Sequence, residues 1–72
     1  MVFKMTLVKK YEYDDGSYQF WNTELWHTTC VSEKQAISRT AWHLRKQGIY
    51  LGVKDIREGC VRTYLKAEQV GV

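Results

Sequence analysis

The sequence predicts an α+β fold in which an antiparallel sheet carries one helix packed across one of its faces. Three observations indicate this fold. The first residues alternate between apolar and polar side chains, an Asp-Gly pair follows them, and a later segment has apolar residues at helical spacing. We therefore expect the element order β-β-α-β-β in one small domain that covers residues 1–72.

The alternating stretch, residues 1–13, predicts the first strand. One face of this strand carries large apolar side chains: Met1, Phe3, Met5, Leu7, Tyr11 and Tyr13. The other face combines polar side chains with two valines: Lys4, Thr6, Lys10, Glu12, Val2 and Val8. The segment Asp14-Asp15-Gly16-Ser17 then predicts a tight hairpin turn, because glycine supplies the positive φ that such a turn needs.

The return strand is expected from Ser17 to about Trp26, and its alternation is irregular. Tyr18 and Phe20 share one face, whereas Trp21, Thr23 and Leu25 share the other. The adjacent Phe20 and Trp21 indicate a β-bulge that switches the inward-facing side of the strand. The alternative interpretation is a regular strand in a sheet whose two faces are both partly apolar.

Residues 33–47 predict an amphipathic helix with well-defined ends. Ser32 is the expected N-cap residue of a capping box with Gln35, and Gly48 is the expected residue beyond the C-cap. The face expected to be buried carries Ile37, Ala41 and Leu44, with Thr40 beside them.

The last part of the chain predicts two more strands. Ile49 to Arg57 is expected to form the third strand, and Glu58-Gly59 the turn after it. Cys60 to about Ala67 alternates again and is expected to form the fourth strand. Residues 68–72 are expected to be a frayed tail.

Composition limits the classes of function. A chain of 72 residues buries a thin core, and its net charge of +3 favours anionic partners only weakly. No charged segment followed by an apolar one opens the chain, and no apolar run reaches membrane-spanning length. We therefore expect a cytoplasmic protein with free thiols and no membrane partner. The alternative is an exported protein with a Cys30–Cys60 disulfide.

The histidines and cysteines do not predict a metal site. The full set is His27, Cys30, His43 and Cys60. His27 and Cys30 have the spacing of a ligand pair, but His43 and Cys60 do not form the second close pair that structural zinc sites show. No convergent set of catalytic residue types is visible either, so we expect neither an enzyme nor a bound cofactor.

The most unusual feature is Trp42, which projects roughly 140° away from Ile37 on the helix, into the polar face. This places a large indole among basic and polar residues. The candidate partner-binding residues are Trp42, Arg39, Lys46, Arg45, Gln35 and Lys34. The structural alternative is that the indole folds onto the sheet edge or is covered by Arg39 or Lys46. Trp26, beside His27, is a second candidate of the same kind.

These residues predict a small, non-enzymatic binding protein that holds a protein partner through the Trp42 face. In size and element order the chain resembles the small accessory and inhibitor proteins encoded by bacteriophages and mobile elements, which implies action by covering a partner's surface. Two alternatives remain. The same face suits a nucleic acid, with bases on the indole and phosphates on the cations. A homodimer would instead bury Trp42 or an edge strand between two copies.

Overall fold

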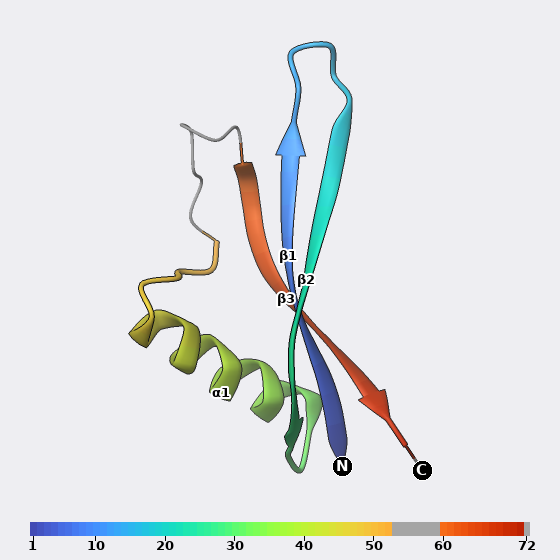
Figure 1. The fold of residues 1–72 in the computed structure, drawn as a ribbon, viewed down its shortest axis with the longest axis vertical. Helices are drawn as coiled ribbons and strands as arrows, with labels where there is room; N and C mark the ends of the chain where they lie inside the picture. Colours follow the sequence, from blue (N-terminus) through green and yellow to red (C-terminus); the bar gives the residue numbers. More distant parts are fainter. Residues whose placement is uncertain (53–59, 72) are drawn as a thin grey trace.

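The computed structural model describes residues 1–52 and 60–71, and only the backbone of Cys60 and Val61 within that range. Three strands and one helix follow in the order β1 (Val2–Glu12), β2 (Tyr18–Thr29), α1 (Glu33–Lys46) and β3 (Cys60–Val70) (Figure 1). The strands form one antiparallel sheet in the order β2-β1-β3, and α1 packs on one face of it. The predicted α+β class with an antiparallel sheet and one helix is confirmed.

The β1–β2 hairpin has the predicted turn. Gly16 has a φ of +86°, and its N–H donates to the carbonyl of Tyr13 at 3.0 Å. The N–H of Tyr13 donates to the carbonyl of Ser17 at 2.9 Å, which closes a three-residue loop of the kind that ends in a glycine bulge. The Asp15 carboxylate accepts hydrogen bonds from the side chain and backbone of Ser17, and these bonds hold the pKa of Asp15 below its usual value.

β2 contains one β-bulge, and the position predicted for it was wrong. Phe20 and Trp21 pair in regular register with Lys10 and Lys9. The register shifts further along, where Thr6 pairs with Glu24 but Met5 pairs with Trp26, so Leu25 is the extra residue. At the level of Phe20 and Trp21 both faces of β2 are exposed, so no buried face requires a switch there. At Leu25 the bulge lets two consecutive apolar side chains pack against the core.

α1 has the predicted ends, one residue earlier at its C-terminus. The Ser32 hydroxyl accepts from the N–H of Gln35 at 3.2 Å, and the Gln35 side chain accepts from the N–H of Val31 at 3.0 Å. At the other end, the N–H of Gly48 donates to the carbonyl of Arg45, and the N–H of Ile49 to that of Leu44. These two bonds, with a φ of +83° at Gly48, form a Schellman motif.

The predicted third strand is wrong for Ile49–Gly52, and its remainder, with the turn at 58–59, lies outside the described residues. Ile49 and Leu51 are half-buried in a turn and pack against the core cluster that contains Leu44. The apolar character of this segment therefore reflects packing beneath the helix end. The sheet thus has three described strands instead of the predicted four.

The predicted fourth strand is present as β3, and it extends further than expected. Glu68, Gln69 and Val70 pair with Lys4, Phe3 and Val2, so the prediction of a frayed tail was wrong for these residues. The start of β1 pairs with β2 on one side only, and residues 68–70 pair with its other side. Val72 lies outside the described residues.

The core lies between α1 and one face of the sheet. Phe3, Met5 and Leu7 of β1 are buried against the helix, which contributes Ala36 and Leu44 to the same core. The described residues contain no helix with the length and apolar character needed to cross a bilayer.

The two cysteines lie at opposite ends of the sheet, which rules out the alternative of a Cys30–Cys60 disulfide. Cys30 is a buried free thiol whose N–H donates to the carbonyl of Met1, whereas Cys60 pairs with Tyr11. Ten residues of strand separate Met1 from Tyr11, or about 33 Å. A disulfide requires Cα atoms within about 7 Å.

We expect Leu44→Ala to lower the free energy of unfolding by about 2–5 kcal/mol, because it leaves a cavity where the helix meets the sheet. Urea unfolding followed by circular dichroism measures this change. Val31→Ala, at an exposed position next to the same helix, is the control and should change stability by less than about 0.5 kcal/mol. Equal effects of the two substitutions would contradict this description of the core.

Candidate functional site

Three aromatic side chains form a continuous row from β2 across α1, here called the aromatic strip: Trp26, His43 and Trp42. The rings of Trp42 and His43 have centroids 5.4 Å apart and meet edge to face at 73°. The rings of His43 and Trp26 are 6.3 Å apart at 87°. Trp42 is 55% exposed, so the predicted outward position of this indole is confirmed.

The strip exists because α1 covers the sheet unevenly. The helix packs mainly against β3 and β1 through Ala36, Thr40 and Leu44, and leaves a groove between itself and β2. This groove has a volume of about 380 Å³. It is lined by Trp26, Thr28, Arg39, Thr40, His43 and Gln47. A second, open hollow of about 580 Å³ on the outer side of the helix is lined by Ser38, Arg39, Trp42 and His43. His43 and Arg39 therefore separate the two hollows and border both.

Two cations flank the strip. The Lys46 ammonium lies 3.6 Å from the centroid of the Trp42 ring, in a cation–π contact. Arg39 donates from its guanidinium to the carbonyl of Thr29 at 3.3 Å and lies 3.7 Å from the Cys30 sulfur. Lys46 thus covers the indole, as the structural alternative expected, but on one side of the ring only. More than half of Trp42 stays exposed.

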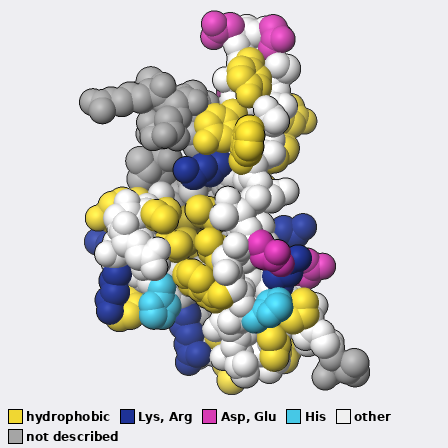
Figure 2. Space-filling model, viewed as in Figure 1, with side chains coloured by type: hydrophobic (Ala, Val, Ile, Leu, Met, Phe, Trp, Pro, Cys, Tyr) yellow, Lys and Arg dark blue, Asp and Glu magenta, His cyan; other side chains and the backbone are white. Residues whose placement is uncertain are grey.

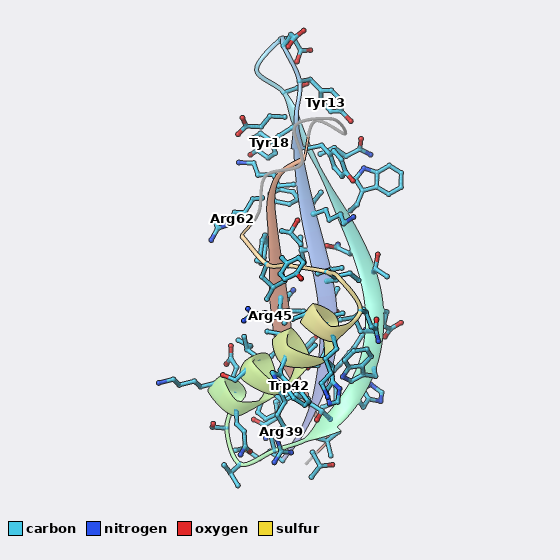
Figure 3. The ribbon with its side chains drawn as sticks, turned by 90° about the vertical axis from the view of Figure 1, so that its left-hand side faces the viewer. Tyr13, Tyr18, Arg39, Trp42, Arg45 and Arg62 are labelled. Atoms are coloured by element: carbon cyan, nitrogen blue, oxygen red, sulfur yellow. The ribbon has the colours of Figure 1, made fainter. Side chains whose placement is uncertain are left out.

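The structure brings together three of the six predicted site residues: Arg39, Trp42 and Lys46. Arg45 is exposed on the same helix beside Trp42, as Figure 3 shows. Lys34 is exposed in the first turn, about 12 Å along the helix from Trp42. The Gln35 side chain accepts the Val31 N–H and so belongs to the helix cap.

The surface around the strip is basic. Glu33 is the one acidic residue of α1, against the cations Lys34, Arg39, Arg45 and Lys46. Figure 2 shows Lys and Arg side chains gathered over the helix, and acidic side chains at the hairpin tip and over the sheet. An approaching anionic group therefore meets the cations of α1 at short range and the acidic groups only at a distance.

The residues considered for zinc do not converge in the described part of the chain. His27 pairs with Lys4 on β1, Cys30 is buried, and His43 belongs to the strip. Among the described side chains, which exclude that of Cys60, no three His, Cys, Asp or Glu residues gather as a metal site would require.

The opposite face of the sheet is a weaker candidate. It has a shallow hollow of about 550 Å³ whose lining includes Lys4 and Glu24. Lys4 and Glu24 form an ion pair at 2.9 Å, and Lys10 and Glu12 another at 3.6 Å. The cations of this face are thus already partly neutralised, in contrast to those of α1. The hydrogen bond and charge of Glu24 raise the pKa of Lys4, and those of Lys4 lower the pKa of Glu24.

Sequence reasoning did not identify His43 as part of the site and named Trp26 only separately. One signal was present: Arg39, Trp42, His43 and Lys46 have the i, i+3, i+4, i+7 spacing of one helix face. The contact of His43 with Trp26 depends on where the helix crosses the sheet, which this spacing does not determine. No protein-family model, curated protein or solved structure matches this chain.

We expect Thr40→Val to stabilise the protein by about 1 kcal/mol. Thr40 is 1% exposed, and its hydroxyl has no hydrogen-bond partner among the described residues. Valine keeps the shape and removes the cost of an unsatisfied buried hydroxyl. Urea unfolding measures the change, with Thr40→Ser as the control that keeps the hydroxyl and should not stabilise. A destabilised Thr40→Val variant would show that this hydroxyl makes a bond in solution.

We expect Glu24→Gln to flatten the dependence of stability on pH in the acid range. The folded-state pKa of Glu24 lies below 4.5, so its ion pair with Lys4 stabilises the protein above about pH 4.5, and this contribution is lost as the pH falls through the lowered value. Urea unfolding between neutral pH and pH 3 measures the slope. Lys4→Met should flatten it similarly, and the double variant should be no flatter than either single one. Additive effects would contradict a shared ion pair.

Proposed function

We propose that this chain is a non-enzymatic binding domain that holds an acidic protein surface through the aromatic strip, with Arg39 and Lys46 at its sides. The observation that carries the proposal is an indole, Trp42, that is held in place by its neighbours and yet is 55% exposed. Tryptophan and arginine are the residues most enriched among those that dominate the energy of protein interfaces.

The geometry of Trp42 lowers the cost of binding. Lys46 and His43 contact the ring from two directions, so the side chain is ordered before a partner arrives. Immobilising a free side chain at an interface costs about 0.5–1.5 kcal/mol, and a pre-ordered ring avoids much of that cost. The hollow beside the indole also gives a partner side chain a place to pack.

The charge of α1 supports an acidic partner. The helix carries four cations and one acidic residue. Lys46 lies directly over the exposed ring, and Arg39 lines the hollow beside it. Complementary charge at the rim of an interface raises the association rate and selects among partners, while the buried aromatic residue supplies most of the affinity. We therefore expect the affinity to fall only moderately with salt.

The contacts of Trp42 favour a protein over a nucleic acid. A base that stacks on the indole needs an open ring face, and the Lys46 ammonium already occupies one face at 3.6 Å. The His43 ring approaches edge-on. Stacking on the occupied face would displace the cation that a neighbouring phosphate needs, so a base has only the opposite face of the ring to stack on. Binding of a nucleic acid would weaken steeply with salt, by about one counterion for each phosphate contact.

The test is quantitative affinity capture from the native host with three baits: wild type, Trp42→Ala and Tyr50→Ala. Tyr50 is 54% exposed, almost as much as Trp42, and lies outside the aromatic strip, which makes it a matched control. We expect one protein that wild type and Tyr50→Ala retain and that Trp42→Ala loses by about tenfold or more, since hot-spot residues contribute about 2 kcal/mol or more. The captured protein is then purified and its Kd measured at several salt concentrations.

The proposal requires that the purified partner carry an acidic surface and that capture survive nuclease treatment. Two results would overturn it. One is a set of captured proteins that Trp42→Ala leaves unchanged. The other is capture that nuclease abolishes, with an affinity that falls steeply with salt, which would indicate the nucleic-acid alternative.

A further inference from the structure

We propose that a second copy of this chain pairs along the outer edge of β2, over Tyr18–Glu24, and joins the two sheets into one symmetric six-stranded sheet. This interface lies on the half of the β1–β2 hairpin that extends past the helix (Figure 1). It does not depend on the aromatic strip, and the two proposals stand or fall separately.

The two edges of the sheet differ in how they are covered. On β3, the N–H of Gly52 donates to the carbonyl of Thr63 at 2.8 Å, and α1 packs against the same strand. β2 pairs with β1 on its inner side, and no other described strand pairs with its outer side. A long open edge of this kind presents unpaired N–H and carbonyl groups to any extended segment.

Up to Thr23, the sequence of this edge lacks the features that normally prevent strand pairing. Tyr18–Thr23 is six consecutive exposed residues without a charge, and the chain has no proline. Trp21, 57% exposed, lies in its centre. Proteins usually protect an exposed edge with charge, proline or a bulge, and the bulge of β2 lies beyond this stretch, at Leu25.

The hairpin turn determines which backbone groups point outward. Because the Tyr13 N–H donates to the Ser17 carbonyl, residue 17 faces β1, and the alternation of an antiparallel ladder continues without a shift to Glu24. The N–H and carbonyl groups of Tyr18, Phe20, Asn22 and Glu24 therefore point away from β1. This gives four residues at two-residue spacing that are free to exchange hydrogen bonds with another strand.

A second copy fits this edge better than an unrelated segment. In the register centred on Trp21, the outward groups of Phe20 meet those of Asn22 in the other copy, and the two Trp21 side chains lie opposite each other. Cross-strand aromatic pairs stabilise sheets, most directly at such non-hydrogen-bonded positions. Each chain carries a net charge of +3, and a neutral edge lets two copies meet without placing like charges together.

The experiment is sedimentation velocity of the full chain over the micromolar range, with three substitutions at one position. Asn22→Pro removes an outward N–H and leaves the β1–β2 ladder intact, because a proline is tolerated where its nitrogen faces solvent. By symmetry it removes two hydrogen bonds, and we expect about tenfold weaker dimerisation or more. Asn22→Lys places two like charges beside the symmetry axis and should act in the same direction. Asn22→Ala is the control that should keep the dimer.

Circular dichroism verifies that each variant keeps the fold, and Asn22→Lys decides the outcome if the proline variant does not fold. Trp42→Ala should dimerise as wild type does, even if it loses its partner. Four results would overturn the proposal: a monomeric wild type over the whole range, assemblies larger than a dimer, a dimer that persists in both Asn22→Pro and Asn22→Lys, or a dimer that Trp42→Ala abolishes.

Discussion

One helix cannot cover this sheet, and most features of the molecule follow from that mismatch. α1 has 14 residues and is therefore about 21 Å long, whereas the 12 residues of β2 span about 40 Å. Both clusters of buried apolar side chains in the described part of the chain lie where the two overlap, around Met5 and Leu44. Among the described residues, no second layer covers the far half of the hairpin or the opposite face of the sheet, and large side chains such as Phe20 and Trp21 are exposed there.

The chain stabilises its uncovered rings with cations. Lys10 lies 4.6 Å from the centre of the Tyr18 ring, and the Arg62 guanidinium lies 5.1 Å from that of Tyr64. The helix has a contact of the same kind, in which the Lys46 ammonium lies 3.6 Å from the centre of the Trp42 ring. Each contact shields one side of a ring at a cost of little more than side-chain entropy. Trp42 differs from Tyr18 and Tyr64 in its surroundings. It borders the hollow on the outer side of the helix, and the adjacent His43 also lines the groove beside β2.

Features that depend on neighbours in sequence were predictable, and features that depend on where the helix lies were not. The helix caps and the turn at Gly16 are governed by interactions over three to five residues, and these predictions are confirmed. The outward position of Trp42 follows from helical geometry alone. The bulge position and the conformation of Ile49–Gly52 depend on which part of the sheet the helix covers. The contact of His43 with Trp26 depends on it too. The length of β3 depends on how far β1 offers it an edge to pair with.

The bulge at Leu25 separates the two surfaces of β2. Side chains alternate along a strand, so a shift of one residue turns every later side chain to the other face. If β2 continued in regular register, Leu25 would pair with Met5 and Trp26 with Lys4. Trp26 would then point to the face opposite the helix and could not meet His43, and the groove beside α1 would lose one wall. Because the shift comes after Glu24, the outer part of β2 keeps a regular ladder, and its edge carries no charge from Tyr18 to Thr23. A single inserted residue thus gives one strand both a wall of the groove and an edge that is open to pairing.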